Sequence, residues 1–157
     1  MKVISIFFLS FILFFACTKK KGLQDESITG LLKSLSETEN FEQASACYTA
    51  GTLRIVSDII TFNNISKDEL FPILAFLRGA LSWDIIAEII TEDTAAFNIM
   101  ITDHVTDNMV GFALPCLMRR EQDKWRIDME KEMTIMRDSF KSRSKNSYLN
   151  KKLKESL

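Results

Sequence analysis

The spacing of apolar residues changes once along this chain, from a helical period to a strand period, and this change constrains the fold most. Up to about residue 78, apolar residues recur every three or four positions, as in amphipathic helices. From Trp83 onward every second residue is apolar, as in half-buried strands. Helices followed by strands predict an α+β fold, because parallel strands would need long crossover connections that are absent here.

Two helices are predicted before residue 65. The first is short, and its apolar stripe is formed by Ile28, Leu31, Leu32 and Leu35. Ser36 and Glu39 have the spacing of a capping box, in which both side chains bond to free backbone N–H groups, so a second helix should begin there. Helical spacing then continues for about six turns until Asn63 and Asn64, which makes this the longest predicted helix.

A third helix is predicted at residues 67–78, with Ser66 and Glu69 as a second capping box. Pro72 lies past its first turn, where proline removes a helical hydrogen bond and crowds an earlier carbonyl. We therefore expect a kink at Pro72 or two short helical pieces.

Four strands are predicted in the second half, at about residues 83–90, 95–102, 110–118 and 125–130. The apolar side of the third strand is formed by Val110, Phe112, Leu114, Cys116 and Met118. Pro115 lies within that strand and cannot donate to a β-ladder, so the strand should be bulged or at an edge there. The prediction is a curved four-stranded antiparallel meander with the N-terminal helices packed on it.

The first residues predict export from the cytoplasm. Lys2 precedes a stretch from Val3 to Ala16 in which only Ser5 and Ser10 are not apolar. As a helix this stretch would be about 21 Å long, which is too short for a hydrocarbon core of about 30 Å. A basic start, a short apolar segment and a small residue at its end are typical of a secretory signal.

The end of this stretch, Leu13-Phe14-Phe15-Ala16-Cys17, resembles a bacterial lipoprotein signal with a relaxed lipobox. The resemblance implies cleavage before Cys17, diacylglycerol on its thiol and acylation of its amine. Two or more acyl chains, helped by Lys19 to Lys21, would attach the protein stably to a membrane. Two alternatives remain open, namely a signal cleaved without lipidation and an uncleaved anchor helix.

These assignments divide the chain into a signal peptide at 1–16, a tether at 17–26, an α+β domain at 27–132 and a basic C-terminal helix or tail at 133–157. The body is acidic, with fourteen Asp or Glu and four Lys or Arg from Asp25 to Asp107. The tail would either solubilise the protein, which we favour, or attract anionic lipid or another envelope polyanion. Nucleic acid is not an expected partner of an exported chain. Thr18, where an aspartate would indicate inner-membrane retention, favours the outer membrane.

A second resemblance spans about residues 36–131. Helices followed by a meander that closes on Asp123-Lys124-Trp125-Arg126-Ile127-Asp128 resemble the nuclear transport factor 2-like, or cystatin-like, α+β cone fold of small bacterial lipoproteins. That resemblance implies a curved sheet around a long helix, with a pocket at the wide end. Some members are enzymes and many exported members have no known activity, so the fold assigns no reaction.

Four aromatic residues are candidates for lining an apolar pocket, namely Tyr48, Phe97, Phe112 and Trp125. Such a pocket would hold a lipid or another small hydrophobe. The alternative, which we favour, is that aromatics at helix or strand spacing belong to the core.

Polar candidates for catalysis or metal binding are few. The single histidine, His104, stands near Asp103 and Asp107 in a polar loop, without the spacing of a metal site, so a solvated turn is expected. Glu88 is expected to be solvated. We predict no catalytic residues, no metal site and no cofactor.

Cys47 and Cys116 remain once Cys17 is assigned to lipid. In an oxidising compartment they could form a disulfide. Buried free thiols are favoured, because few arbitrary residue pairs bring their Cα atoms within about 7 Å.

These features predict a lipid-anchored cell-envelope protein with a non-catalytic binding domain for a small apolar ligand or an envelope partner. One alternative is a hydrolase or isomerase of the same superfamily, for which acidic residues would point into the pocket. The other is a structural or host-facing surface lipoprotein, for which the core would be closed.

Overall fold

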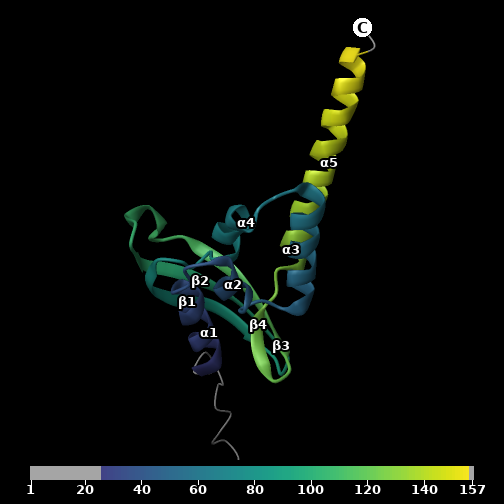
Figure 1. The fold of residues 1–157 in the computed structure, drawn as a ribbon. Coiled ribbons are helices and arrows are strands. Elements are labelled where there is room, and N and C mark those ends of the chain that lie inside the picture. The colour runs from purple at the N-terminus through teal and green to yellow at the C-terminus, as the bar shows by residue number, and fades with distance from the viewer. Residues whose placement is uncertain (1–25, 156–157) are drawn as a thin grey trace, which may run out of the picture.

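The structure is a computed structural model that describes residues 26–155 of the 157-residue chain (Figure 1). The predicted signal peptide and Cys17 lie outside the described residues. The elements follow in the order α1 (Glu26–Ser36), α2 (Phe41–Ser45), α3 (Ala50–Asn63), α4 (Lys67–Leu74), β1 (Ala80–Ile90), β2 (Thr94–His104), the 3₁₀ turn η1 (Asp107–Met109), β3 (Ala113–Glu121), β4 (Lys124–Ile127) and α5 (Glu130–Glu155).

The four strands form one antiparallel sheet in the order β1-β2-β3-β4, which curls into a half-barrel (Figure 1). The predicted α+β class and the four-stranded meander are therefore confirmed. Within residues 26–155, no helix is both long and apolar enough to cross a bilayer.

Strand β2 shows the predicted alternation most clearly. Ala95, Phe97, Ile99 and Ile101 are buried, while the residues between them are exposed or half-buried. The buried set belongs to one apolar cluster that also contains Ile28, Leu32 and Leu35 of α1. The predicted apolar stripe of the first helix is thus part of the core.

The prediction of one long second helix is wrong, because the structure has two helices, α2 and α3, in its place. Residues 46–49 interrupt it, because their backbone bonds to β4 instead of continuing the helix. The N–H of Thr49 donates to the carbonyl of Ile127 at 2.9 Å, and the N–H of Ile127 donates to the carbonyl of Cys47 at 2.8 Å. Helix α3 then begins anew with Thr49 as its N-cap. Its end at Asn63 and the left-handed Asn64 agree with the prediction.

The capping box predicted at Ser36 and Glu39 does not form. Ser36 is the last residue of α1, and its hydroxyl donates to the carbonyl of Lys33 at 2.8 Å. Asn40 caps α2 instead by accepting the N–H of Gln43.

The capping box at Ser66 and Glu69 is present, and it starts α4 as predicted. This helix ends at Leu74 rather than continuing to residue 78. Pro72 lies inside the helix, two residues before its end, and has no N–H to donate to an earlier turn.

Strand β3 begins at Ala113, three residues later than predicted, because η1 and Gly111, with a φ of +85°, occupy the preceding positions. Phe112 therefore lies outside the strand and is 55% exposed, which corrects its place on the apolar side. Strand β4 pairs only with Met118–Glu121 of β3, so Pro115 has a partner strand on one side only. This geometry satisfies the expectation for proline.

Helix α5 is continuous from Glu130 to Glu155. Its first part packs beside α3 and contributes Met133 to the core, while its remainder projects beyond the rest of the molecule (Figure 1). The start of α1 and the end of α5 lie at opposite ends of the molecule (Figure 1).

Candidate functional site

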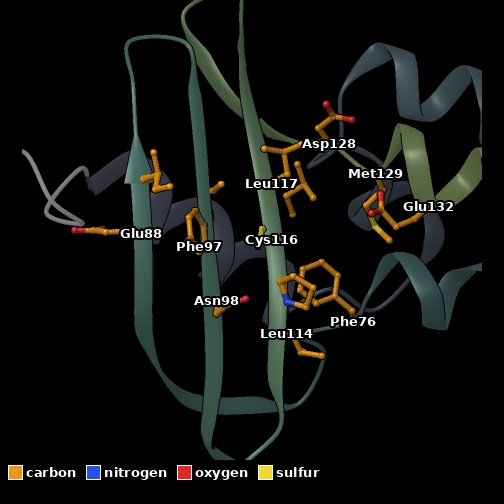
Figure 2. A pocket seen from close by; sticks show the side chains of 14 residues that line it. Phe76, Glu88, Phe97, Asn98, Leu114, Cys116, Leu117, Asp128, Met129 and Glu132 are labelled. Carbon is orange, nitrogen blue, oxygen red and sulfur yellow. The ribbon is translucent and has the colours of Figure 1, made fainter.

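A cavity of about 610 Å³ lies between the sheet and the start of α5 (Figure 2). This volume is within the range of about 300–1,000 Å³ that is typical of small-molecule sites. Its walls are formed by Phe76, Glu88, Ile89, Ala96, Phe97, Asn98, Leu114, Pro115, Cys116, Leu117, Ile127, Asp128, Met129 and Glu132. Most of these side chains are apolar, so the cavity favours an apolar occupant.

Three strands supply the floor through residues that lie opposite each other. Ala96 of β2 is paired with Ile89 of β1 on one side and with Leu117 of β3 on the other. Directly opposed residues in an antiparallel sheet point to the same face, so these three side chains form one row. All three are exposed, and Ile89 is 73% exposed. The row is therefore open to solvent and accessible to a ligand.

The opposite wall is formed by Asp128 and Met129, which precede α5, and by Glu132 in its first turn (Figure 2). The N–H of Asp128 donates to the carbonyl of Leu117 at 2.8 Å, which ties this wall to β3. The N–H of Met129 donates to the hydroxyl of Thr52 at 2.9 Å, which ties it to α3. The first of these contacts fixes the wall relative to the floor, and the second fixes it relative to α3.

Asp128 is a buried carboxylate with an ion pair at Oδ2 and a hydrogen bond at Oδ1, while Oδ2 accepts no hydrogen bond from the described residues. Oδ2 is ion-paired with Nε of Arg119, and Oδ1 accepts the N–H of Glu130 at 3.0 Å. Because these interactions compensate its charge and help to start α5, Asp128 has a structural role.

The other two carboxylates of the cavity differ in position. Glu132 is exposed in the first turn of α5 and forms no hydrogen bond or ion pair among the described residues. Glu88 is exposed on β1, at the far edge of the site, and its carboxylate points away from the other labelled side chains (Figure 2). The prediction that Glu88 is solvated agrees with this exposure.

Of the four aromatic residues predicted to line a pocket, Phe97 lines this cavity and the other three do not. Tyr48 and Trp125 are buried in the core, and Phe112 lies on the surface. The hydroxyl of Tyr48 donates to the carbonyl of Leu74, and Trp125 packs under the guanidinium of Arg120. The structure therefore does not bring the four rings together.

Cys47 and Cys116 are both buried free thiols. Burial raises the pKa of the Cys116 thiol to about 12. Burial also raises the pKa of Cys47, although the nearby guanidinium of Arg126 opposes this shift. Although Cys116 lines the cavity, its thiol is therefore protonated at neutral pH and a poor nucleophile.

His104 has structural contacts through both ring nitrogens. Nδ1 accepts the N–H of Thr106 at 2.9 Å, so Nε2 carries the proton and donates to the carbonyl of Arg78 at 3.0 Å. Within residues 26–155, no group of three or more His, Cys, Asp or Glu side chains is placed to hold a metal ion. His104 is not among the residues that line the cavity.

Comparison with protein-family models, curated proteins and solved structures finds no match. The site must therefore be interpreted from its own geometry. That geometry combines an apolar floor, an open side and carboxylates near one wall, which suits binding of a small apolar molecule with one polar group.

Sequence reasoning missed Ala96 and Leu117 because they lie on the outward face of the sheet, whereas Phe97 and Cys116 lie in the neighbouring row that faces the core. Ala96 and Leu117 alternate with buried residues, so the strand period alone predicts that they are solvated. Their apolar character on a face where polar residues are usual was the available signal. Phe76, Met129 and Glu132 carried no such signal, because only the fold brings them to the sheet.

Proposed function

We propose that this protein is a lipid-anchored cell-envelope protein whose α+β domain binds a small apolar ligand without chemical conversion. The observation that carries the binding function is the cavity of about 610 Å³ with mainly apolar walls. The solvent-exposed row of Ile89, Ala96 and Leu117 gives a ligand access to it. A purely structural role would be favoured by a core without a cavity, so the presence of this cavity supports binding instead.

The proposal includes two finer assignments that are supported by sequence resemblance. Diacylglycerol on Cys17 would attach the protein to a bacterial membrane, and we favour the outer membrane. The curled antiparallel sheet preceded by helices supports a cystatin-like cone fold.

The alternative function is that of a hydrolase or isomerase, and the presence of Asp128 and Glu132 at the cavity is the observation that favours it. General acid–base catalysis needs a carboxyl group that is free to exchange a proton with the substrate. Asp128 is ion-paired with Arg119 and accepts the N–H of Glu130, so Glu132 is the acid of this wall that has no partner among the described residues. A binding site is therefore the better-supported function.

Binding is tested by photolabelling the full-length protein in a non-ionic detergent with a dodecanol analogue that carries a diazirine in its chain. We expect saturable labelling of peptides that contain Ala96 and Leu117. The variant Ala96→Trp should fill the cavity and reduce labelling about tenfold, a loss of about 1.4 kcal/mol of binding free energy.

The matched control is Ala113→Trp, because Ala113 is an exposed strand residue that does not line the cavity. It should leave labelling unchanged. Labelling that is absent from the cavity peptides, or equal in the two variants, would refute the binding function.

The anchor is tested separately by mass spectrometry and detergent-phase partitioning of the native protein. We expect a mature N-terminus at Cys17 with acyl mass, and loss of detergent-phase partitioning in Cys17→Ser. An intact Met1 or an unmodified residue 17 would refute lipid attachment without affecting the binding test.

A further inference from the structure

The charged side chains that line the cavity all have one sign, and this restricts the chemistry of a ligand. The ionisable groups that form its walls are the carboxylates of Glu88, Asp128 and Glu132 and the thiol of Cys116. The walls contain no Lys, Arg or His side chain within the described residues. An anionic head group would therefore lie near carboxylates without a cation in the wall to compensate it.

The three carboxylates are not equivalent. Asp128 is compensated by Arg119, and Glu88 points away at the far edge (Figure 2). Glu132 lies beside Met129 on the same wall and has no partner among the described residues. Glu132 is thus the carboxylate that can form an ion pair with a ligand.

The apolar floor and Glu132 lie on different walls of one cavity, so they can be contacted by different parts of one molecule. Ile89, Ala96 and Leu117 offer a continuous apolar row across three strands. The side chain of Asn98, half-buried in the same site, adds one neutral hydrogen-bonding group. This division suits a molecule with an apolar body and one positively charged end.

We infer that the cavity takes a single-chain amphiphile with a cationic amine head group, which pairs with Glu132 while its chain covers the row of Ile89, Ala96 and Leu117. This inference rests on the proposed binding function and specifies its ligand class.

The inference is tested with three diazirine-bearing probes of equal chain length, namely analogues of dodecylamine, dodecanol and dodecanoic acid. Each is added to the full-length protein in non-ionic detergent, and labelling of the cavity peptides is measured against probe concentration. We expect half-maximal labelling by the amine at a concentration about tenfold lower than by the alcohol. The carboxylate probe should label least.

Two substitutions at Glu132 test whether this residue causes the preference for the amine probe. Because Glu132 is exposed, both substitutions are compatible with folding. Glu132→Gln should make the amine and alcohol probes equivalent, because it removes the carboxylate that pairs with the amine. Glu132→Lys should reverse the order, so that the carboxylate probe labels better than the amine. The control is Glu92→Gln, because Glu92 is an exposed acid in the β1–β2 turn and is not part of the cavity.

Equal labelling by amine and alcohol in the unmodified protein would overturn the cationic preference, as would a preference that persists in Glu132→Gln. Either result leaves the binding function standing. Failure of all three probes to label the cavity peptides would instead refute the binding function itself.

Discussion

Arg119 and Asp128 form an ion pair between an exposed guanidinium and a buried carboxylate. The side chain of Arg119 is 57% exposed, and that of Asp128 is 3% exposed. The pair joins β3 to the residues that precede α5, next to the hydrogen bond between Asp128 and Leu117. It therefore helps to hold the two walls of the cavity in place.

Removal of the two partners should have unequal effects on stability. Arg119→Ala leaves a buried carboxylate without its counter-charge, and we expect a loss of about 1–3 kcal/mol in the free energy of unfolding. Asp128→Asn keeps an oxygen for the N–H of Glu130 and leaves only an exposed guanidinium without a partner, so the loss should be smaller. Urea unfolding of both variants checks the order, and a larger loss for Asp128→Asn would contradict it.

Tyr48→Phe should affect stability but not ligand binding. The substitution removes the hydroxyl that donates to the buried carbonyl of Leu74, and leaves that carbonyl without this donor. We expect the free energy of unfolding to fall by about 1–2 kcal/mol. Labelling by the dodecanol analogue should remain the same, because Tyr48 does not line the cavity. A reduction in labelling equal to that of Ala96→Trp would place Tyr48 in the site.

The stability of the protein should fall at alkaline pH partly because of Cys116. Its pKa is raised from 9.0 to about 12 by burial, so the unfolded chain loses the proton first. The contribution of Cys116 is complete below pH 9 and is lost between about pH 9 and pH 12, at up to about 1.4 kcal/mol per pH unit.

Comparison of the native protein with Cys116→Ala tests this contribution. The variant will have its own baseline stability, so the informative quantity is the dependence on pH. Urea unfolding at pH 8 to about pH 10.5 should show a shallower decline for Cys116→Ala. Parallel curves would contradict the raised pKa.

Ser66→Ala should weaken α4 by removing its capping hydroxyl. The expected loss is about 1 kcal/mol at neutral pH, which is typical of an N-cap. Hydrogen bonds from the backbone and hydroxyl of Ser66 lower the pKa of Glu69 below 4.5, so their stabilising effect is present above that pH and is lost on acidification. The difference between Ser66→Ala and the native protein should therefore shrink in acid.

The control for this experiment is Ser139→Ala. The hydroxyl of Ser139 bonds to the carbonyl of Ile135 within the exposed surface of α5, where no free N–H depends on it. Chemical unfolding should show little change. A loss as large as that of Ser66→Ala would mean that helix capping is not the cause.

The sequence predicted those parts of the fold that depend on local patterns. Burial of alternate residues in β2 follows from the period of its apolar residues, and the start of α4 follows from the Ser66 capping box. Both signals lie within a few residues of the structure that they predict.

The break between α2 and α3 could not be predicted in the same way. It depends on two hydrogen bonds with Ile127, which donates its N–H to the carbonyl of Cys47 and accepts the N–H of Thr49 from far away in the sequence. The cavity has the same origin, since the residues around Met129 reach Leu117 only after the sheet has formed. Alternation along a strand separates inward from outward residues, but it does not show which outward residues another element will cover.

Helix α5 extends from the cavity to a point far from the other elements (Figure 1). Its 26 residues correspond to about 39 Å at 1.5 Å per residue. Its first turn borders the cavity, and its far end stands clear of the other elements (Figure 1). Because the helix is long, any tilt about Met129 would move its C-terminal end much further than its first turn.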